Sequence, residues 1–338
     1  MKAVAYQTPL PISDPASLQD VELPGPIAHG HDLLVEVKAV SVNPVDYKVR
    51  ASRTPPAGEW GVIGWDAAGV VRAVGSDVTL FRPGDRVWYA GDISRAGSNA
   101  ELQLVDERIV GRMPESLDFA QAAALPLTTI TAWELLFDRL GMAPGKRPLD
   151  QRLLIIGAAG GVGSILTQLA RRLTAAIVIG TASRAETKAW VKDHGAHHVI
   201  DHGLPLTDEL KRIGLENVTH VASLNHTETH FAQIVEVIAP QGRLAMIDDP
   251  KAPLDLLRLK PKSVSVHWEF MFTRSLFKTA DMIAQHHLLD EVAALVDAGV
   301  IQTTVGEHFG AINATNLKRA HALLESGKAR GKIVLEGF

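Results

Sequence analysis

A glycine-rich segment in the middle of the chain has the residue types and spacing that bind phosphate groups. Residues 157–163 are Gly-Ala-Ala-Gly-Gly-Val-Gly, between an apolar run at 153–156 and a segment with apolar residues at helical spacing. In a strand–turn–helix of this kind, Gly157 allows the sharp turn, Gly160 lets the backbone approach a pyrophosphate, and Gly163 lets the helix pack closely. The alternative is a glycine turn with a structural role only. We interpret the segment as a dinucleotide-binding turn.

The end of the next predicted strand, residues 176–181, indicates which dinucleotide binds. NAD sites place Asp or Glu about 20 residues past the glycines, where it accepts from the ribose 2′-hydroxyl. This chain has Ser183 and Arg184, which suit a 2′-phosphate, and Lys188 and His202 could add positive charge. Alternatively, Ser183 caps the next helix and Arg184 is solvated; Glu186, an acid close by, argues against a phosphate site. We predict NADP(H) as the cofactor.

Composition limits the classes of protein and partner. The 338 residues are 46% hydrophobic and 21% charged, with a net charge of −4, which fits one large or two medium domains. The chain lacks a long basic run, so we expect no nucleic-acid partner. It has no cysteine, which excludes disulfides and thiolate chemistry. No signal-peptide core and no apolar stretch of roughly 20 residues is present, so we expect no membrane partner and, by elimination, a cytoplasmic location.

The pattern of elements changes along the chain. Residues 1–125 are predicted to be all-β and barrel-like, with strands at 33–40 and 67–74, followed by a helix around 131–140. Residues 152–272 alternate strands and helices, which predicts a doubly wound parallel sheet. The last residues predict helices at 288–298 and 317–324 and a strand at 332–335 that rejoins the N-terminal β domain. The six predicted strands of the parallel sheet lie near 153–156, 176–181, 198–201, 218–224, 243–247 and 263–270.

Four further motifs accompany the glycine turn: GWDAAG at 64–69, RPGDRV at 82–87, GSNAE at 97–101 and LTTITAW at 127–133. With them the chain resembles the medium-chain dehydrogenase/reductases over nearly its whole length. The nearest branch is the zinc-independent quinone-oxidoreductase-like one, often labelled zinc-type alcohol dehydrogenase-like. The resemblance implies an α/β protein in which a Rossmann NADP-binding domain, 126–274, is inserted in a GroES-like β-barrel catalytic domain, 1–125 and 275–338. It also implies a homodimer, because family members pair their sixth strands.

The zinc label does not fit the residues. Zinc alcohol dehydrogenases hold catalytic zinc with Cys, His and Cys, and the matching positions here are Asn43, Trp65 and roughly Leu127. Such a site needs about three ligands from Cys, His, Asp or Glu, and only Asp66 remains nearby. The four-Cys structural zinc lobe is missing too. The segment 226–230, His-Thr-Glu-Thr-His, is not a His-Glu-x-x-His motif, so we interpret its histidines as surface residues. We predict an enzyme without a metal.

The resemblance also suggests catalytic residues. Quinone reductases of the family carry Asn-x-x-Asp where this chain has residues 43–46, with the Asn facing the nicotinamide and the substrate. They tend to have Tyr two residues after the Asp, whereas here Tyr47 follows Asp46 directly and Lys48 comes next. Hydride transfer needs a group that stabilises charge on the acceptor oxygen, so Asn43, Tyr47 and Lys48 are the predicted catalytic residues. A structural ion pair is favoured for Asp46, and a solvent-exposed role is the alternative for Lys48.

The predicted cofactor contacts come largely from strand ends. Thr131 matches the family threonine beside the nicotinamide, or else its buried hydroxyl bonds its own helix. The aromatic stretch 268–272 follows the sixth strand and either lines the cleft or packs in the core. The predicted cofactor-binding residues are Thr131, Gly160, Gly161, Val162, Ser183, Arg184, Lys188, His202, Ser223, Leu224, Ile247, Phe270, Phe272 and Lys332.

These features predict an NADPH-dependent, zinc-independent oxidoreductase that transfers hydride to a quinone or an α,β-unsaturated carbonyl. Both acceptors are small conjugated carbonyl compounds that take hydride without a metal, and the sequence leaves the choice between them open. The alternative is an NADPH-binding structural or RNA-binding protein of the zeta-crystallin type with little catalysis. The net charge of −4 and the absence of a basic stripe argue against RNA binding.

Overall fold

The computed structural model describes residues 1–146 and 150–338. Its contacts divide the chain into two compact units. Unit 1 comprises Met1–Ile130 and Phe272–Phe338, and unit 2 comprises Thr131–Met271. The sequence places the two boundaries after 125 and after 274, where the contacts place them after 130 and after 271.

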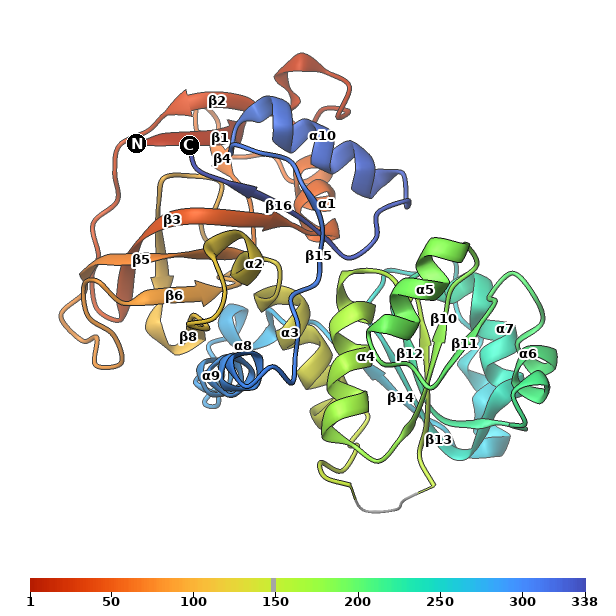
Figure 1. Ribbon diagram of the computed structural model, residues 1–338. Coiled ribbons are helices and arrows are strands. Elements are labelled where there is room, and N and C mark those ends of the chain that lie inside the picture. Colours follow the sequence, from red (N-terminus) through yellow and green to blue (C-terminus); the bar gives the residue numbers. More distant parts are fainter. Residues whose placement is uncertain (147–149) are drawn as a thin grey trace. The chain divides into compact units, whose positions relative to one another are not determined.

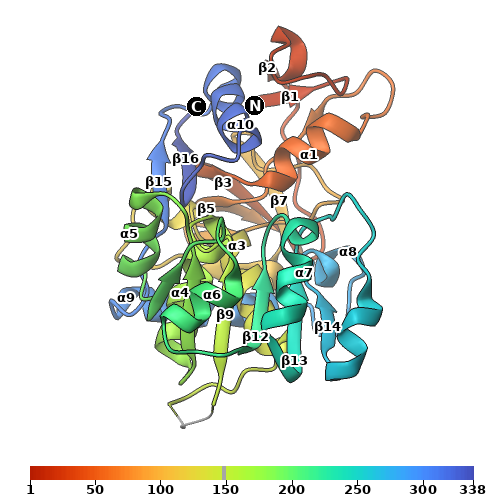
Figure 2. The same ribbon diagram turned by 90° about the vertical axis from the view of Figure 1, so that its right-hand side faces the viewer.

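Unit 2 is built on a six-stranded parallel sheet with the strand order β11-β10-β9-β12-β13-β14. Figure 2 shows β9, β12, β13 and β14 side by side. The order runs outward in both directions from the first strand, β9, which confirms the predicted doubly wound arrangement. The strands are β9 (Arg152–Ile156), β10 (Ile177–Thr181), β11 (His198–Ile200), β12 (Val218–Ser223), β13 (Ile238–Met246) and β14 (Ser265–Trp268).

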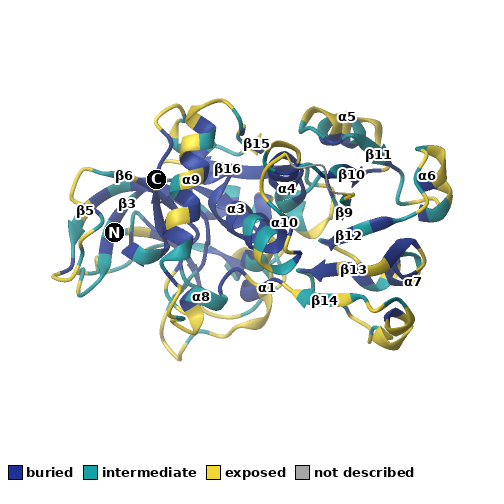
Figure 3. Ribbon diagram, turned by 90° about the horizontal axis from the view of Figure 1, so that it is seen from below, coloured by how far each residue is buried: buried dark blue, intermediate teal, exposed yellow. Residues whose placement is uncertain are grey.

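Helices cover both faces of this sheet. In Figure 1, α4 and α5 lie on one face and α6 and α7 on the other. The side chains between these layers form an apolar core, and the inner strands β9, β12 and β13 are mostly buried in Figure 3 while α5 and α6 carry exposed residues. The helices are α4 (Gly161–Leu173), α5 (Ala185–Asp193), α6 (Leu206–Arg212), α7 (Thr227–Val237) and the 3₁₀ helix η4 (Leu256–Lys262).

Unit 1 contains two sheets. The larger has the order β15-β16-β3-β5-β6-β8, with β7 also paired to β3, and the smaller has the order β2-β1-β4. The last strand pairs antiparallel with β3, with Val334 opposite Ser41, which confirms the predicted return to the N-terminal domain. The strands are β1 (Lys2–Tyr6), β2 (Gln19–Glu22), β3 (Asp32–Val42), β4 (Gly61–Val62), β5 (Ala67–Val74), β6 (Arg86–Tyr89), β7 (Leu102–Asp106), β8 (Val110–Arg112), β15 (Val305–His308) and β16 (Lys332–Glu336).

The prediction that residues 1–125 are all-β is wrong at the first helix, α1 (Pro44–Ser52). Its start has Asn43 at the N-cap, proline in the first turn and Asp46 as an acid near the N-terminus, which are helix-start signals. The helix predicted at 131–140 begins earlier, as α3 (Pro126–Trp133), and continues as the π-helix η3 (Glu134–Arg139). No helix of the described residues is both long and apolar enough to cross a bilayer. The remaining helices are η1 (Pro15–Ser17), η2 (Glu107–Ile109), α2 (Phe119–Ala123), α8 (Thr273–Leu276), α9 (Ala284–Asp297) and α10 (Ala314–Glu325).

Candidate active site

The carboxyl edge of the unit 2 sheet brings together many of the predicted cofactor-binding residues. Strand register places Ile156 opposite Ser223 and Ser223 opposite Met246, and the Ala182 amide donates to the Ile200 carbonyl over 3.0 Å. Segments that follow these strand ends therefore meet at one edge, where open α/β sheets bind ligands. The predicted residues that follow a strand end at this edge are Gly160, Gly161, Val162, Ser183, Arg184, His202, Leu224, Ile247 and Phe270, and Ser223 itself ends β12.

The glycine turn has the geometry that the sequence predicts. Gly157 has a φ of +83°, and a Cβ there would lie 2.7 Å from the Asn225 Oδ1. A Cβ on Gly163 would lie 2.4 Å from the Gly157 carbonyl oxygen, so the helix approaches the strand more closely than any side chain allows. Gly160 is the N-cap of α4 and has no side chain to occupy the amides of the first turn. These residues fit a bound pyrophosphate.

The corner where β10 and β11 end carries the predicted 2′-phosphate residues. Ser183 and Arg184 are exposed, and the N-cap of α5 is Arg184, so the alternative in which Ser183 caps this helix is not observed. Arg184 Nε lies 3.2 Å from Glu186 Oε1 on the surface. Lys188 Nζ lies 2.9 Å from Asp201 Oδ2, and this contact lowers the pKa of Asp201. The corner thus combines a hydroxyl with two cations, each paired to an acid.

Some predicted residues lie deeper in unit 2. The Ser223 hydroxyl is buried and lies 2.7 Å from the Thr227 hydroxyl, which donates to Asp248. Thr131 is also buried, on α3. Phe270 is 46% exposed, so packing in the core does not explain this aromatic ring.

In unit 1, Phe272 is buried and packs edge-on against Trp65, with 6.2 Å between the ring centroids. Its ring is therefore a core element of unit 1. Tyr47 is half-buried and Lys48 is exposed on α1, so an exposed position, the alternative considered for Lys48, is the one observed.

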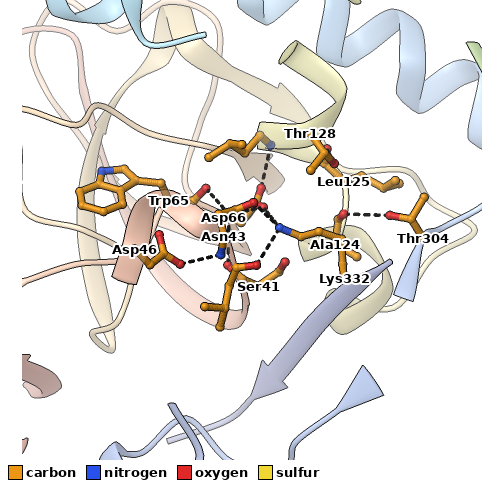
Figure 4. Close-up of polar contacts among 12 residues, drawn as sticks. Ser41, Asn43, Asp46, Trp65, Asp66, Ala124, Leu125, Thr128, Thr304 and Lys332 are labelled. Carbon is orange, nitrogen blue, oxygen red and sulfur yellow. Dashed lines mark hydrogen bonds and ion pairs between the residues drawn. The ribbon is translucent and has the colours of Figure 1, made fainter. Parts of the chain in front are cut away.

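A buried polar cluster of Asn43, Asp66 and Lys332 lies in unit 1 (Figure 4). Lys332 Nζ donates to Asp66 Oδ2 over 2.9 Å, to the Val42 carbonyl over 3.1 Å, and to Asn43 Oδ1. The Asn43 Nδ2 donates to the same Asp66 oxygen over 2.8 Å and to the Trp65 carbonyl over 3.2 Å. Lys332 is 3% exposed and Asp66 0%, so all three polar groups are held away from solvent.

The electrostatics of the cluster are those of a buried ion pair. Burial raises the pKa of Asp66, while the Lys332 ammonium and hydrogen bonds from Leu127 and Asn43 oppose that rise. The Leu127 amide donates to Asp66 Oδ1 over 2.8 Å, so both carboxylate oxygens accept hydrogen bonds. Burial also raises the pKa of the neighbouring Asp46 to about 7. A lone buried carboxylate is costly, and here a lysine and two amide donors compensate Asp66.

This geometry changes the interpretation of two predicted residues. Lys332 was predicted to bind the cofactor, but three protein oxygens accept its hydrogens, so the structure assigns it to the Asp66 ion pair. The structural ion pair expected for Asp46 is wrong. Its Oδ2 accepts a hydrogen bond from the backbone N–H of Asn43 over 2.8 Å, and this bond stabilises the start of α1. The catalytic role of Asn43 stays a prediction, but its amide hydrogens point to Asp66 and Trp65, so it would act by holding the cluster.

The residues at the zinc positions of zinc dehydrogenases do not fit zinc. Asn43 presents an amide, the Trp65 indole donates to the Asp92 carbonyl, and Leu127 is apolar. The nearby Asp66 is neutralised by Lys332. Among the described residues, no group of three or more His, Asp or Glu side chains is arranged to hold a metal ion. No step of the chemistry proposed below uses zinc.

Sequence reasoning missed the partnership of Asp66 with Lys332, because the two residues are 266 positions apart and only the pairing of β16 with β3 brings them together.

Sequence reasoning also missed a second buried cluster, which lies in unit 2. There Arg139 Nε donates to Glu269 Oε2 over 2.8 Å, and the Glu134 carboxyl lies within hydrogen-bonding reach of Glu269. Burial and the nearby Glu134 raise the pKa of Glu269 to about 9, so one proton is held between the two carboxyl groups.

We expect Glu269→Gln to lessen the fall in stability as pH rises from 5 to 9. The folded pKa of Glu269, about 9, lies above the unfolded value of about 4.3, so its stabilising proton is fully present below pH 4.3 and lost as pH rises towards 9. Glutamine does not titrate, yet it keeps an acceptor for Arg139 and a donor for Glu134. Between pH 5 and 9, the free energy of unfolding of the variant should rise relative to that of wild type by at least about 1 kcal/mol, as measured by urea unfolding. Parallel pH profiles for both proteins would show that no proton is shared, and Glu228→Gln is the control.

Comparison with known proteins agrees with the fold. Residues 29–115 match the family model described as alcohol dehydrogenase GroES-like domain, and residues 194–335 match the one described as zinc-binding dehydrogenase. The chain belongs to the medium-chain dehydrogenase/reductase superfamily, whose members are oxidoreductases.

Individual relatives include proteins of several names. A zinc-type alcohol dehydrogenase-like protein of Staphylococcus aureus strain Mu50 is 39% identical over 99% of both chains. A Rhizobium etli CFN 42 protein, provisionally assigned to the zinc-dependent alcohol dehydrogenases, has a solved structure with a TM-score of 0.96 and 59% identity, covering 100% of this chain and 98% of that one. The Escherichia coli quinone oxidoreductase, solved with NADPH, has a TM-score of 0.84 and 26% identity, covering 99% of this chain and 100% of that one.

Proposed function

We propose that the protein is an NADPH-dependent, zinc-independent reductase of quinones or of α,β-unsaturated carbonyl compounds. The observation that carries this proposal is that Asn43, Trp65 and Leu127 stand at the zinc-ligand positions, while the nearby Asp66 is paired with Lys332. An alcohol dehydrogenase without a metal lacks the Lewis acid that polarises an isolated carbonyl or alcohol. A conjugated acceptor needs less assistance, because the charge that hydride addition creates is delocalised.

In this proposal the cofactor lies along the carboxyl edge of the unit 2 sheet. The amides that begin α4 would bind the pyrophosphate, with Gly160, Gly161 and Val162 closest to it. Ser183 and Arg184 would bind the 2′-phosphate, the guanidinium exchanging its surface contact with Glu186 for a charge-assisted bond. When bound, the nicotinamide supplies the hydride. The E. coli quinone oxidoreductase solved with NADPH supports this choice of dinucleotide.

The fixed dipoles of unit 1 supply the polar part of the proposed reaction. Asn43 is held by Asp66, Trp65 and Lys332, so the backbone around it is rigid, and preorganised groups cost no reorganisation during reaction. Tyr47 and Lys48 follow on α1 and remain the proposed proton donors. If neither supplies the proton, it comes from solvent.

We also propose a cytoplasmic homodimer. Among the described strands, β14 is paired along one side only, with β13, and it carries Trp268 at 56% exposure. An open strand edge with an exposed aromatic residue suits pairing with a second copy of the same strand. Neither nucleic acid nor membrane is part of this proposal.

A substrate panel tests the proposal. Initial rates would be measured with NADPH and with NADH on a benzoquinone, a naphthoquinone, an enal, an enone, a saturated aldehyde and a primary alcohol in the reverse direction. We expect turnover of the conjugated acceptors with NADPH and negligible rates on the saturated aldehyde and the alcohol. Rapid oxidation of simple alcohols would contradict the proposed class. Tight NADPH binding without turnover of any acceptor would favour the structural or RNA-binding alternative.

We expect Arg184→Ala to weaken NADPH binding and to leave NADH binding nearly unchanged. The exposed guanidinium follows the end of β10, and a lost charge-assisted phosphate contact weakens affinity by about tenfold or more. Titration of nucleotide fluorescence measures both dissociation constants. Arg172→Ala, at the far end of α4, is the control. Equal losses for both nucleotides would show that Arg184 does not recognise the 2′-phosphate.

A further inference from the structure

Three histidines gather near the ends of β11 and β12 in unit 2. His202 follows β11, His226 is the N-cap of α7, and His230 lies near the start of that helix. The rings of His202 and His230 meet edge to face, with 5.9 Å between centroids and 82° between planes. His230 is only 8% exposed, so its interpretation as a surface residue is wrong. A ring contact of this kind fixes the orientation of both imidazoles.

Both rings of this pair have an unused nitrogen. The Nδ1 atoms of His202 and His230 are buried and have no hydrogen-bond partner among the described residues. Buried polar atoms are nearly always hydrogen-bonded, so two such atoms on contacting rings indicate that another group binds there. An imidazole can donate from one nitrogen and accept at the other, and when charged it donates from both.

The pair adjoins the corner assigned above to the 2′-phosphate. The Ala182 amide donates to the Ile200 carbonyl, so the segment that begins at Ser183 and the segment that carries His202 leave the sheet together. Lys188 reaches Asp201, the residue before His202, over 2.9 Å. His202 is therefore the third basic side chain of this corner, and the His230 ring on α7 packs against the His202 ring.

We propose that His202 and His230 act as one recognition element for the 2′-phosphate of the cofactor. His202 donates to the phosphate, and His230 is a positioning residue that holds the His202 ring in place. This inference rests on the proposed function, whose cofactor it concerns. It assigns to this pair the part of NADPH selectivity that Ser183 and Arg184 do not supply.

The charges around the pair predict a pH dependence. Burial lowers the pKa of His230, as do the neighbouring His202 and His226, whereas Asp248 and Glu228 oppose the fall. His230 is thus kept neutral at neutral pH, and a phosphate dianion beside an imidazole favours its protonation. Affinity for the phosphate should therefore rise as pH falls. The titratable and charged groups near the pair are His226, Glu228, Asp248, Asp201, Lys188 and Glu209.

Adenosine 2′,5′-bisphosphate and 5′-AMP are the probes that isolate the 2′-phosphate. Their dissociation constants would be measured by calorimetry at pH 6.5, 7.5 and 8.5, with the full-length protein. We expect His230→Asn and His202→Asn each to weaken the bisphosphate by roughly three- to tenfold and to leave 5′-AMP unchanged. The double variant should bind the bisphosphate no more weakly than the single variant that binds it less tightly, because His230 acts through His202. His308→Asn, on β15 in unit 1, is the matched control.

The pH series adds a second readout. In wild type the preference for the bisphosphate should increase from pH 8.5 to 6.5, and His202→Asn should flatten this increase. The phosphate itself titrates near pH 6, but it does so equally for every variant, so the difference between variants isolates the histidines. The inference is overturned if His230→Asn weakens both probes equally, leaves both unchanged, or adds fully to His202→Asn. If wild type does not prefer the bisphosphate at any pH, the proposed choice of cofactor fails instead.

Discussion

A Lys332→Met variant is expected to lose about 3–5 kcal/mol of folding free energy at pH 8. Methionine fills a similar volume but leaves the Asp66 carboxylate buried without its counter-charge, and removing one partner of a buried pair costs far more than the pair contributes. The ammonium opposes the upward shift of the Asp66 pKa, so its loss raises that pKa further. The carboxyl can then take up a proton as pH falls. The deficit should therefore shrink between pH 8 and pH 5, as measured by urea unfolding at both values.

A second substitution provides the control. Asp66→Asn removes the charge that Lys332→Met leaves unpaired, so the double variant should recover part of the lost stability. An exposed lysine on α1 offers the matched comparison, and Lys48→Met should change stability by less than about 0.5 kcal/mol. If Lys332→Met is as stable as wild type at pH 8, the cluster is not a compensated ion pair.

Asn43→Ala is expected to lower kcat by about 10²–10³-fold while NADPH affinity changes little. In the proposed function this residue holds the buried cluster with Asp66 and Lys332 in place. The structure shows how the position is held, because the amide donates to Asp66 and Trp65 and accepts from Lys332. Alanine removes all three contacts and loosens the groups that the reaction needs fixed. Steady-state rates with the best conjugated acceptor, together with NADPH titration, measure both quantities.

The conservative replacement Asn43→Asp and the neighbouring Tyr47→Phe and Lys48→Met complete this series. Asn43→Asp keeps the acceptor for Lys332 but opposes Asp66, so it should lose turnover as well. If Tyr47 or Lys48 supplies the proton, its replacement should lower kcat, and if solvent does, both variants should be mild. Full turnover by Asn43→Ala on every accepted substrate would mean that the residues after β13 and β14 are better candidates.

The parts of the fold that repeat a local pattern could be predicted from the sequence. Each strand of the parallel sheet is a short apolar run between turn signals, so all six were located within a few residues except at the start of β13. The glycine turn could be predicted because its requirements are local: Gly157 has a positive φ, and Gly163 leaves no room for a Cβ. The helix at 44–52 is harder to predict, because Asn43, Pro44 and Asp46 match a catalytic motif of the family and also form a helix start.

The candidate site could be predicted only where its residues follow strand ends. The carboxyl edge of a parallel sheet brings such residues together whatever lies between them, so Ser183, His202 and Leu224 were placed correctly along the sheet. The Asp66–Lys332 pair depends instead on β16 pairing with β3, and no local pattern specifies which buried carboxylate a distant lysine will meet. No local pattern specifies the contact of Glu134 with Glu269 either, because the two residues lie near opposite ends of the unit 2 sequence.

The position of β16 has a consequence for how the chain folds as it is synthesised. Residues 131–271 contain all six strands of their sheet in one continuous stretch, so this unit can fold once they have left the ribosome. The other sheet has β16, residues 332–336, between β15 and β3. Its interior cannot close until β16 has been made, and until then Asp66 lacks the counter-charge of Lys332. Chaperone dependence and susceptibility to proteolysis during synthesis should therefore concentrate in the unit whose paired strands β3 and β16 are made far apart in time.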